Sequence, residues 1–170
     1  MKTLRIKLSI LLVTITSFSN AQSTELTKFV NPFIGTADNG HTFPGAAMPF
    51  GLVQASPETG NLGWKYCSGY NYADSTIIGF AQSQLNGTGC GDLGDVLLFP
   101  FTGNAELSNY ESRFYKKSEK AFPGYYKVNL ADFGVDIELT AISRTTFYKY
   151  TFNKANAHVL IDLQSGYFVF

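Results

Sequence analysis

The sequence has few charged residues, and after its N-terminus it has no long apolar run. Lys, Arg, Asp and Glu make up 15% of its 170 residues, against roughly 25% in an average soluble domain. Nucleic-acid binding requires clustered cations that displace the counterions of phosphates, and no such cluster is present. A membrane span requires ~20 apolar residues. We therefore expect no nucleic-acid partner and no transmembrane segment.

Cysteine and histidine are also scarce. His41 and His158 are too few and too far apart in sequence to predict a metal centre. His158 falls in an expected strand and is interpreted as a packed core residue. Cys90 has no recognisable partner base, which disfavours a cysteine nucleophile. A disulfide between Cys67 and Cys90 depends on geometry and stays open.

The N-terminus has the pattern of a secretory signal peptide. Lys2, Arg5 and Lys7 form a basic region, residues 8–18 are apolar, and small residues precede an expected cleavage after Ala21. The apolar segment is too short to span a bilayer. Cleavage leaves ten Lys and Arg against thirteen Asp and Glu. We therefore predict a secreted or periplasmic protein with a mildly acidic mature chain.

Aromatic residues and glycine are abundant instead. Aromatic residues account for 15% of the chain, and there are sixteen glycines. Between residues 30 and 94, Gly and Pro recur every few residues, and no segment keeps an apolar stripe at the 3.6-residue spacing of a helix. Short apolar runs bounded by turn residues predict strands at 51–55 and 76–80.

From residue 96 onward the strand pattern is clearer. We predict strands at 96–99 (ended by Pro100), 125–130, 135–140, 144–152 and 158–163. No crossover helices separate them, which favours an all-β, antiparallel β-sandwich. The apolar end at 166–170 is typical of an interrupted strand. We therefore expect a sandwich that is incomplete at its C-terminus.

The only tryptophan lies in an aromatic, Gly-flanked segment, residues 63–72. Sugars present apolar C–H faces beside hydroxyls, so a sugar site requires an aromatic platform next to hydrogen-bonding groups. Trp64 and its three tyrosine neighbours fit that requirement. They also fit an ordinary buried aromatic cluster, and both interpretations stay open.

A second unusual segment is the Gly-rich run at 85–95. Its glycines allow backbone amides to approach a ligand closely. It is not a phosphate loop, because no Gly-Lys-Ser/Thr follows and no helix begins after it. Asp92 and Asp95 are interpreted either as metal ligands or a carboxylate pair, or as side chains that stabilise turns.

Motifs spread along the chain resemble those of one enzyme family. They are VNPFIGT at 30–36, GHTFPGA at 40–46, PFGLVQ at 49–54 with SP at 56–57, GW at 63–64, CSGY at 67–70, DSTI at 74–77, GTGC at 87–90 with GD at 94–95, SRF at 112–114, PGYY at 123–126 and ELTA at 138–141. Together they resemble the opening of glycoside hydrolase family 92 α-mannosidases. The resemblance reaches about residue 163 and is highly specific.

This resemblance implies a galactose-mutarotase-like β-sandwich, here residues 22–170, that packs on a larger (α/α)6-barrel domain. It implies a calcium-dependent exo-α-mannosidase that hydrolyses terminal α-mannosides of glycans with inversion. One carboxylic acid protonates the leaving oxygen, and one carboxylate activates water. The acid, the base and most calcium ligands belong to the barrel, which the sequence lacks. The fragment alone is therefore expected to be inactive, with no catalytic or metal-binding residue of its own.

In this family the N-terminal domain contributes loops that help close the pocket and shape the leaving-group subsite. By motif, the resemblance assigns substrate contact to Trp64, Cys67, Thr88, Gly89, Cys90 and Asp92. The chain departs from the family pattern at 38–39 and at Gln82, Gln84 and Asn86. A stand-alone carbohydrate-binding β-sandwich and an inactive truncated gene product remain as alternatives.

Overall fold

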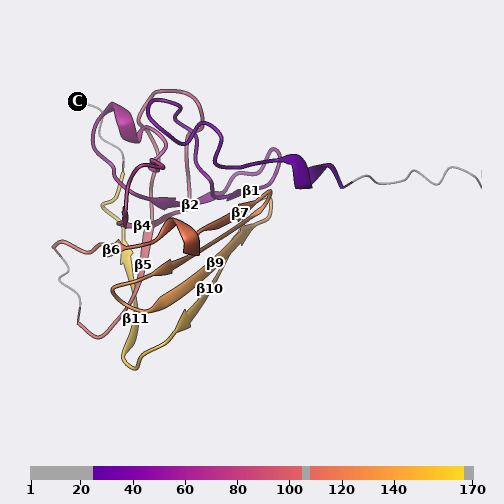
Figure 1. Ribbon diagram of the computed structural model, residues 1–170. Helices are drawn as coiled ribbons and strands as arrows, with labels where there is room; N and C mark the ends of the chain where they lie inside the picture. Colours follow the sequence, from indigo (N-terminus) through magenta and orange to yellow (C-terminus); the bar gives the residue numbers. More distant parts are fainter. Residues whose placement is uncertain (1–24, 105–107, 167–170) are drawn as a thin grey trace, which may run out of the picture.

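The structure, a computed structural model, describes residues 25–104 and 108–166 and consists almost wholly of strands and loops (Figure 1). Its helical segments are three short 3-10 turns, η1 (Leu26–Phe29), η2 (Trp64–Tyr66) and η3 (Lys116–Ser118). None of the helices in these residues is long and apolar enough to cross a membrane. The prediction of a chain without α-helices is therefore confirmed for the described part. The predicted signal peptide and the last four residues of the chain lie outside it.

The strands form three antiparallel sheets. The five-stranded sheet has the order β1 (Ala46–Ala47), β2 (Gln54–Glu58), β4 (Gly79–Ala81), β5 (Leu97–Thr102), β11 (Ala157–Asp162). The four-stranded sheet has the order β10 (Thr146–Phe152), β9 (Val135–Ala141), β8 (Tyr125–Leu130), β7 (Lys120–Phe122). A small third sheet pairs β3 (Thr76–Ile77) with β6 (Ser112–Arg113).

The core lies between the two larger sheets. Along β8 and β9 every second residue is buried, as period-2 alternation requires of a half-buried strand. The buried side chains of these strands pack in one cluster with those of β4 and β5. The cluster includes Val128, Leu130, Ile137, Phe80 and Phe99. The predicted antiparallel β-sandwich is confirmed.

Most strand predictions from residue 96 onward are correct, but β5 does not end at Pro100. Its pairing with β11 runs from Leu97 to Thr102 and includes Pro100 opposite Val159. On the other side, β4 pairs with β5 only at Leu98. A proline is tolerated where a strand has no neighbour that requires its N–H. Local sequence does not reveal which side of a strand is free.

The two strands predicted at 51–55 and 76–80 differ from the observed strands: the first is shifted along the chain and the second is divided in two. Residues 51–53 lead out of a turn in which the Gly51 N–H donates to Met48 O, and β2 begins only at Gln54. The run at 76–80 divides into β3 and β4, which belong to different sheets. His158 is exposed on β11, where its ring stacks on Phe101 with centroids 5.0 Å apart. The interpretation of His158 as a core residue is therefore wrong.

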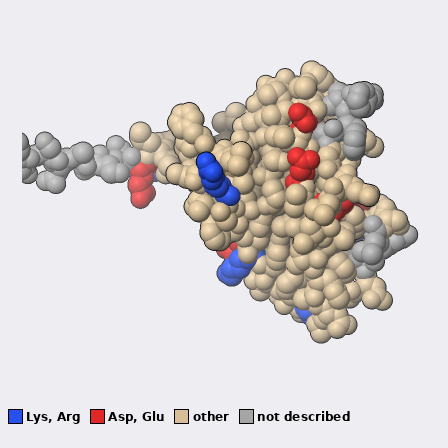
Figure 2. Space-filling view, turned by 180° about the vertical axis from the view of Figure 1, so that it is seen from behind, with Lys and Arg blue, Asp and Glu red and all other residues tan. Residues whose placement is uncertain are grey.

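Charged side chains are sparse on the molecular face shown in Figure 2, as the composition predicts. Two acidic groups, Glu58 and Glu119, are instead buried. Glu119 directly follows η3, and 8% of its surface is exposed. The Tyr126 hydroxyl of β8 and the Tyr70 hydroxyl both donate to its Oε1, at 2.6 and 2.8 Å. The Lys116 ammonium donates to its Oε2 at 3.3 Å. The carboxylate thus connects the four-stranded sheet to the segment that follows η2.

Burial shifts the pKa values of Tyr126 and Lys116 in opposite directions. Burial, and then the charge of Glu119, raises the pKa of Tyr126 well above its ordinary value, so the hydroxyl remains a donor at all physiological pH values. Burial lowers the pKa of Lys116, which lies 4.4 Å from the Phe114 ring centroid and 4.5 Å from that of Tyr72. Aromatic faces partly replace the water that the ammonium loses.

Removing the Tyr126 hydroxyl tests the importance of this cluster. Tyr126→Phe deletes a donor to a buried carboxylate and should lower the free energy of unfolding by about 1.5–3 kcal/mol. Tyr125→Phe is the matched control, because Tyr125 precedes Tyr126 on β8 and its hydroxyl donates to the more accessible Glu138 of β9. Urea unfolding of both variants measures the difference. Equal losses would show that the buried carboxylate has no special role.

Candidate functional site

Three loops meet at one end of the fold. The first, residues 35–42, closes tightly on itself, and a Cβ at Gly40 would lie only 2.0 Å from Gly35 O. The Gly40 N–H donates to Ala37 O, and the Thr42 N–H donates to Gly35 O. Glycine at position 40 is therefore required for this close backbone approach. The other two loops are those around η2 and the Gly-rich run.

Trp64 begins η2 and points outward. The preceding Gly63 has φ +82°, a left-handed conformation that favours glycine. Trp64 is 54% exposed, and its ring meets the His41 ring edge-on at 4.8 Å. Tyr70, in contrast, is buried against Glu119. The aromatic segment thus divides into an exposed indole and an inward tyrosine, and Trp64 is not a core residue.

The Gly-rich loop lies directly against Trp64. The Gly87 N–H donates to His41 O at 2.5 Å. Gly89 has φ +62°, and a Cβ there would lie 2.8 Å from Trp64 Cη2 and 3.1 Å from His41 Nδ1. Any side chain at position 89 would push the indole away. Two of the residues assigned by motif, Trp64 and Gly89, are therefore in contact.

The hydroxyl and carboxylate of this loop make local contacts. Thr88 Oγ1 bonds to the backbone N–H and carbonyl of Cys90, both at 3.3 Å, and remains on the surface. Asp92 Oδ1 accepts the Leu93 N–H at 2.8 Å, which is turn-stabilising geometry. Asp95 is exposed, and its carbonyl accepts the Gln82 N–H. Across residues 25–104 and 108–166, no three His, Cys, Asp or Glu side chains gather as metal ligands would.

The two cysteines carry free thiols, so the disulfide that the sequence left open is not formed. Cys67 ends η2 and is buried, whereas Cys90 is exposed. Burial, with a smaller effect of charge on Cys90, raises the pKa of Cys67. A buried, protonated thiol is a poor nucleophile. Cys67 therefore contributes packing beneath the loop, while Cys90 is on the surface.

Sequence reasoning did not include His41 in the site. The structure places its ring against both Trp64 and Gly89, with only 6% of the residue exposed. A single histidine without metal-ligand spacing carries no functional pattern. The one local signal was the adjacent Gly40, which marks a close backbone approach.

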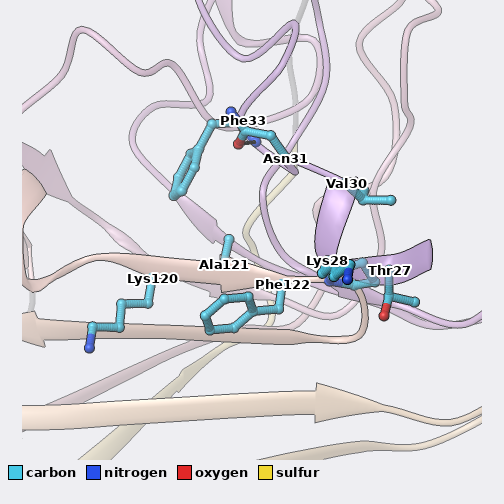
Figure 3. Close-up of a pocket in the computed structure, with 9 residues that line it drawn as sticks. Thr27, Lys28, Val30, Asn31, Phe33, Lys120, Ala121 and Phe122 are labelled. Atoms are coloured by element: carbon cyan, nitrogen blue, oxygen red, sulfur yellow. Dashed lines mark hydrogen bonds between the residues drawn. The ribbon is translucent and has the colours of Figure 1, made fainter. Parts of the chain in front are cut away.

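A separate hollow of about 760 Å³ lies between the N-terminal segment and β7 (Figure 3). Ala121 points from β7 toward the segment that carries Phe33, whereas Lys120 points the other way. The lining residues are Thr27, Lys28, Val30, Asn31, Phe33, Lys120, Ala121, Phe122 and Pro123. They include no carboxylate and none of the residues assigned by motif. The hollow is therefore a weaker candidate than the loops around Trp64.

Solved structures of family GH92 enzymes share this architecture. A GH92 α-mannosidase from Bacteroides thetaiotaomicron is 39% identical with a TM-score of 0.81, over 84% of this chain and 21% of that one. A GH92 inverting mannosidase from B. thetaiotaomicron VPI-5482 is 27% identical with a TM-score of 0.70, over 82% of this chain and 20% of that one.

A curated relative, described as an uncharacterized secreted glycosidase of Arthroderma benhamiae, is 28% identical over 82% of this chain and 20% of its own length. The chain thus spans about a fifth of the length of the relatives that it matches. Residues 29–168 match the profile of the glycosyl hydrolase family 92 N-terminal domain. The chain therefore belongs to glycosyl hydrolase family 92 and corresponds to its N-terminal domain.

Proposed function

We propose that this chain supplies the N-terminal domain of an exported, calcium-dependent exo-α-mannosidase acting on the terminal α-mannosides of glycans. Its loops around Trp64 contact the sugar beyond the cleaved bond and help close the pocket. The contact between the exposed Trp64 indole and the Gly-rich loop is the observation that carries this proposal. Its 39% identity to an α-mannosidase supports the reaction class.

The geometry suits a sugar because it offers two different kinds of contact side by side. The Trp64 indole provides an apolar face for sugar C–H groups. The adjoining loop provides the exposed Thr88 hydroxyl and the backbone around Gly89, where the absence of a side chain allows close approach. A sugar on this surface would be bound by stacking on one side and by hydrogen bonds on the other.

The chemistry itself is assigned to residues outside this chain. Inverting hydrolysis uses two carboxyl groups roughly 6.5–9.5 Å apart around a water. The buried Glu119 is bound by two tyrosines and a lysine, and Asp92 caps a turn. The described residues contain no cluster of three His, Cys, Asp or Glu side chains that could hold a calcium ion. The acid, the base and the calcium shell would belong to a second domain.

An apolar turn supports the presence of that second domain. Phe50 is fully exposed at φ +58°, a left-handed conformation that is strained for a bulky residue. Leu52 beside it is 75% exposed, and its N–H donates to Ser143 O in the β9–β10 turn. Exposed Ile142 adjoins the same turn. Apolar side chains held outward at a cost in strain fit a surface that another domain covers.

The first prediction of the proposed function concerns catalysis by the chain alone. Residues 22–170 should not hydrolyse an aryl α-mannoside, because a paired acid and base are not supplied by the loops around Trp64. Release of the aryl alcohol by the purified chain measures this. Chelator-insensitive turnover that stays with the chain through purification, and is missing from a mock purification of the host, would overturn the assignment.

The second prediction concerns Trp64. The chain is joined in frame to the remaining four fifths of the 39% identical mannosidase. In this hybrid, Trp64→Ala should reduce turnover of α-mannobiose far more than turnover of an aryl α-mannoside with a small leaving group. The lost platform is worth roughly 1–3 kcal/mol to the sugar beyond the cleaved bond.

Tyr115→Ala is the matched control, because Tyr115 is 53% exposed and lies outside the three loops. It should change neither turnover. Equal losses on both substrates for Trp64→Ala, together with a lowered melting temperature, would show that Trp64 only supports the fold. An active hybrid that tolerates Trp64→Ala on both substrates would also refute the proposed contact.

A further inference from the structure

His41 combines two unfavourable local features. Its backbone is left-handed at φ +51°, which costs free energy in any residue other than glycine. Its ring is buried, and among the described residues its Nε2 has no hydrogen-bond partner. A buried unsatisfied polar atom and a strained backbone are each uncommon in native structures, and they concentrate at functional sites. Their coincidence at one residue beside the proposed sugar surface requires a reason.

The surroundings of the ring supply that reason. The His41 ring meets the Trp64 ring at an interplanar angle of 80° with centroids 4.8 Å apart. The Gly-rich loop contacts the same residue, because the Gly87 N–H donates to His41 O and a Cβ at Gly89 would lie 3.1 Å from His41 Nδ1. His41 therefore contacts both the loop around η2, through Trp64, and the Gly-rich loop, through Gly87 and Gly89.

The loop that carries His41 is firmly supported. The Tyr72 N–H donates to Thr36 O at 2.8 Å, and Asn71 Nδ2 donates to Asp38 O at 3.1 Å. Ser68 Oγ donates to Thr42 O at 3.2 Å. These bonds tie the loop to the segment after η2, which the Tyr70–Glu119 bond fixes to the sandwich. The backbone that carries the imidazole is therefore held in place by these hydrogen bonds.

We propose that His41 is a positioning residue that holds the exposed Trp64 indole in one orientation against the Gly-rich loop. The idea that this orientation serves a sugar rests on the proposed function. An indole exposed to this degree would otherwise sample several rotamers, and binding would have to order it. Pre-ordering a side chain of this kind is worth about two- to tenfold in affinity. The buried ring of His41 removes that cost before the ligand arrives.

Trp64 is the only tryptophan of the chain, so its fluorescence reports on this contact alone. Time-resolved anisotropy of the unaltered chain should show little fast rotation of the indole despite its exposure. His41→Asn removes the ring while tolerating a left-handed backbone. It should add a fast depolarising component and steepen acrylamide quenching. His41→Gly should do the same, and His41→Phe, which restores a ring, should reverse part of the change.

Asp38→Asn is the matched control, because Asp38 is left-handed in the same loop at φ +48° and makes its described bond through the backbone. It should leave both readings unchanged. A folded variant without the ring and with wild-type anisotropy would overturn the proposal. Fast indole rotation in the unaltered chain would overturn it as well, even if no variant folds.

The hybrid enzyme separates this inference from the proposed function. There, His41→Asn should raise KM for α-mannobiose about two- to tenfold and leave kcat on an aryl α-mannoside unchanged. If Trp64→Ala has no effect on either substrate while the anisotropy changes occur as expected, the sugar contact is refuted and the positioning of Trp64 stands. A loss of kcat on both substrates would mean that His41 acts on the fold as a whole.

Discussion

The buried carboxylate of Glu119 joins the four-stranded sheet to the loop segment that follows η2. A carboxylate taken out of water must be compensated by donors, and here two tyrosine hydroxyls and an ammonium provide them. Tyr126 belongs to the four-stranded sheet, whereas Tyr70 follows η2. The donors therefore cannot satisfy the charge unless the sheet and the loop segment are correctly placed. The need to satisfy this buried charge therefore fixes the loop segment after η2 against the four-stranded sheet.

The loops around Trp64 gain their order from this anchor through a short series of contacts. Tyr70 fixes the segment after η2, and that segment holds residues 35–42 through Asn71 and Tyr72. This loop in turn presents the ring that meets Trp64. The surface thus acquires rigidity from the sandwich although it lies entirely on loops, which is the usual arrangement of binding residues on a stable scaffold.

The sequence allowed some of this to be predicted. β8 and β9 were predicted nearly to the residue. One face of each strand is buried, so apolar and polar side chains alternate along it. β1, β3 and β6 have two residues each, too few to show a period. Trp64 and the Gly-rich loop were identified by composition. The role of His41 depends on three loops meeting, and no local pattern records that.

The strand order has a consequence for how the chain folds. β7 to β10 follow one another in sequence and pair as successive neighbours, so this sheet forms from short loop closures. β5 and β11 are neighbours at one edge of the five-stranded sheet, and the whole of β7–β10 lies between them in the chain. The entropy of loop closure therefore favours formation of the hairpin sheet before β11 joins β5. Once formed, the hairpin sheet would bring β11 close to β5 and shorten the loop that their pairing must close.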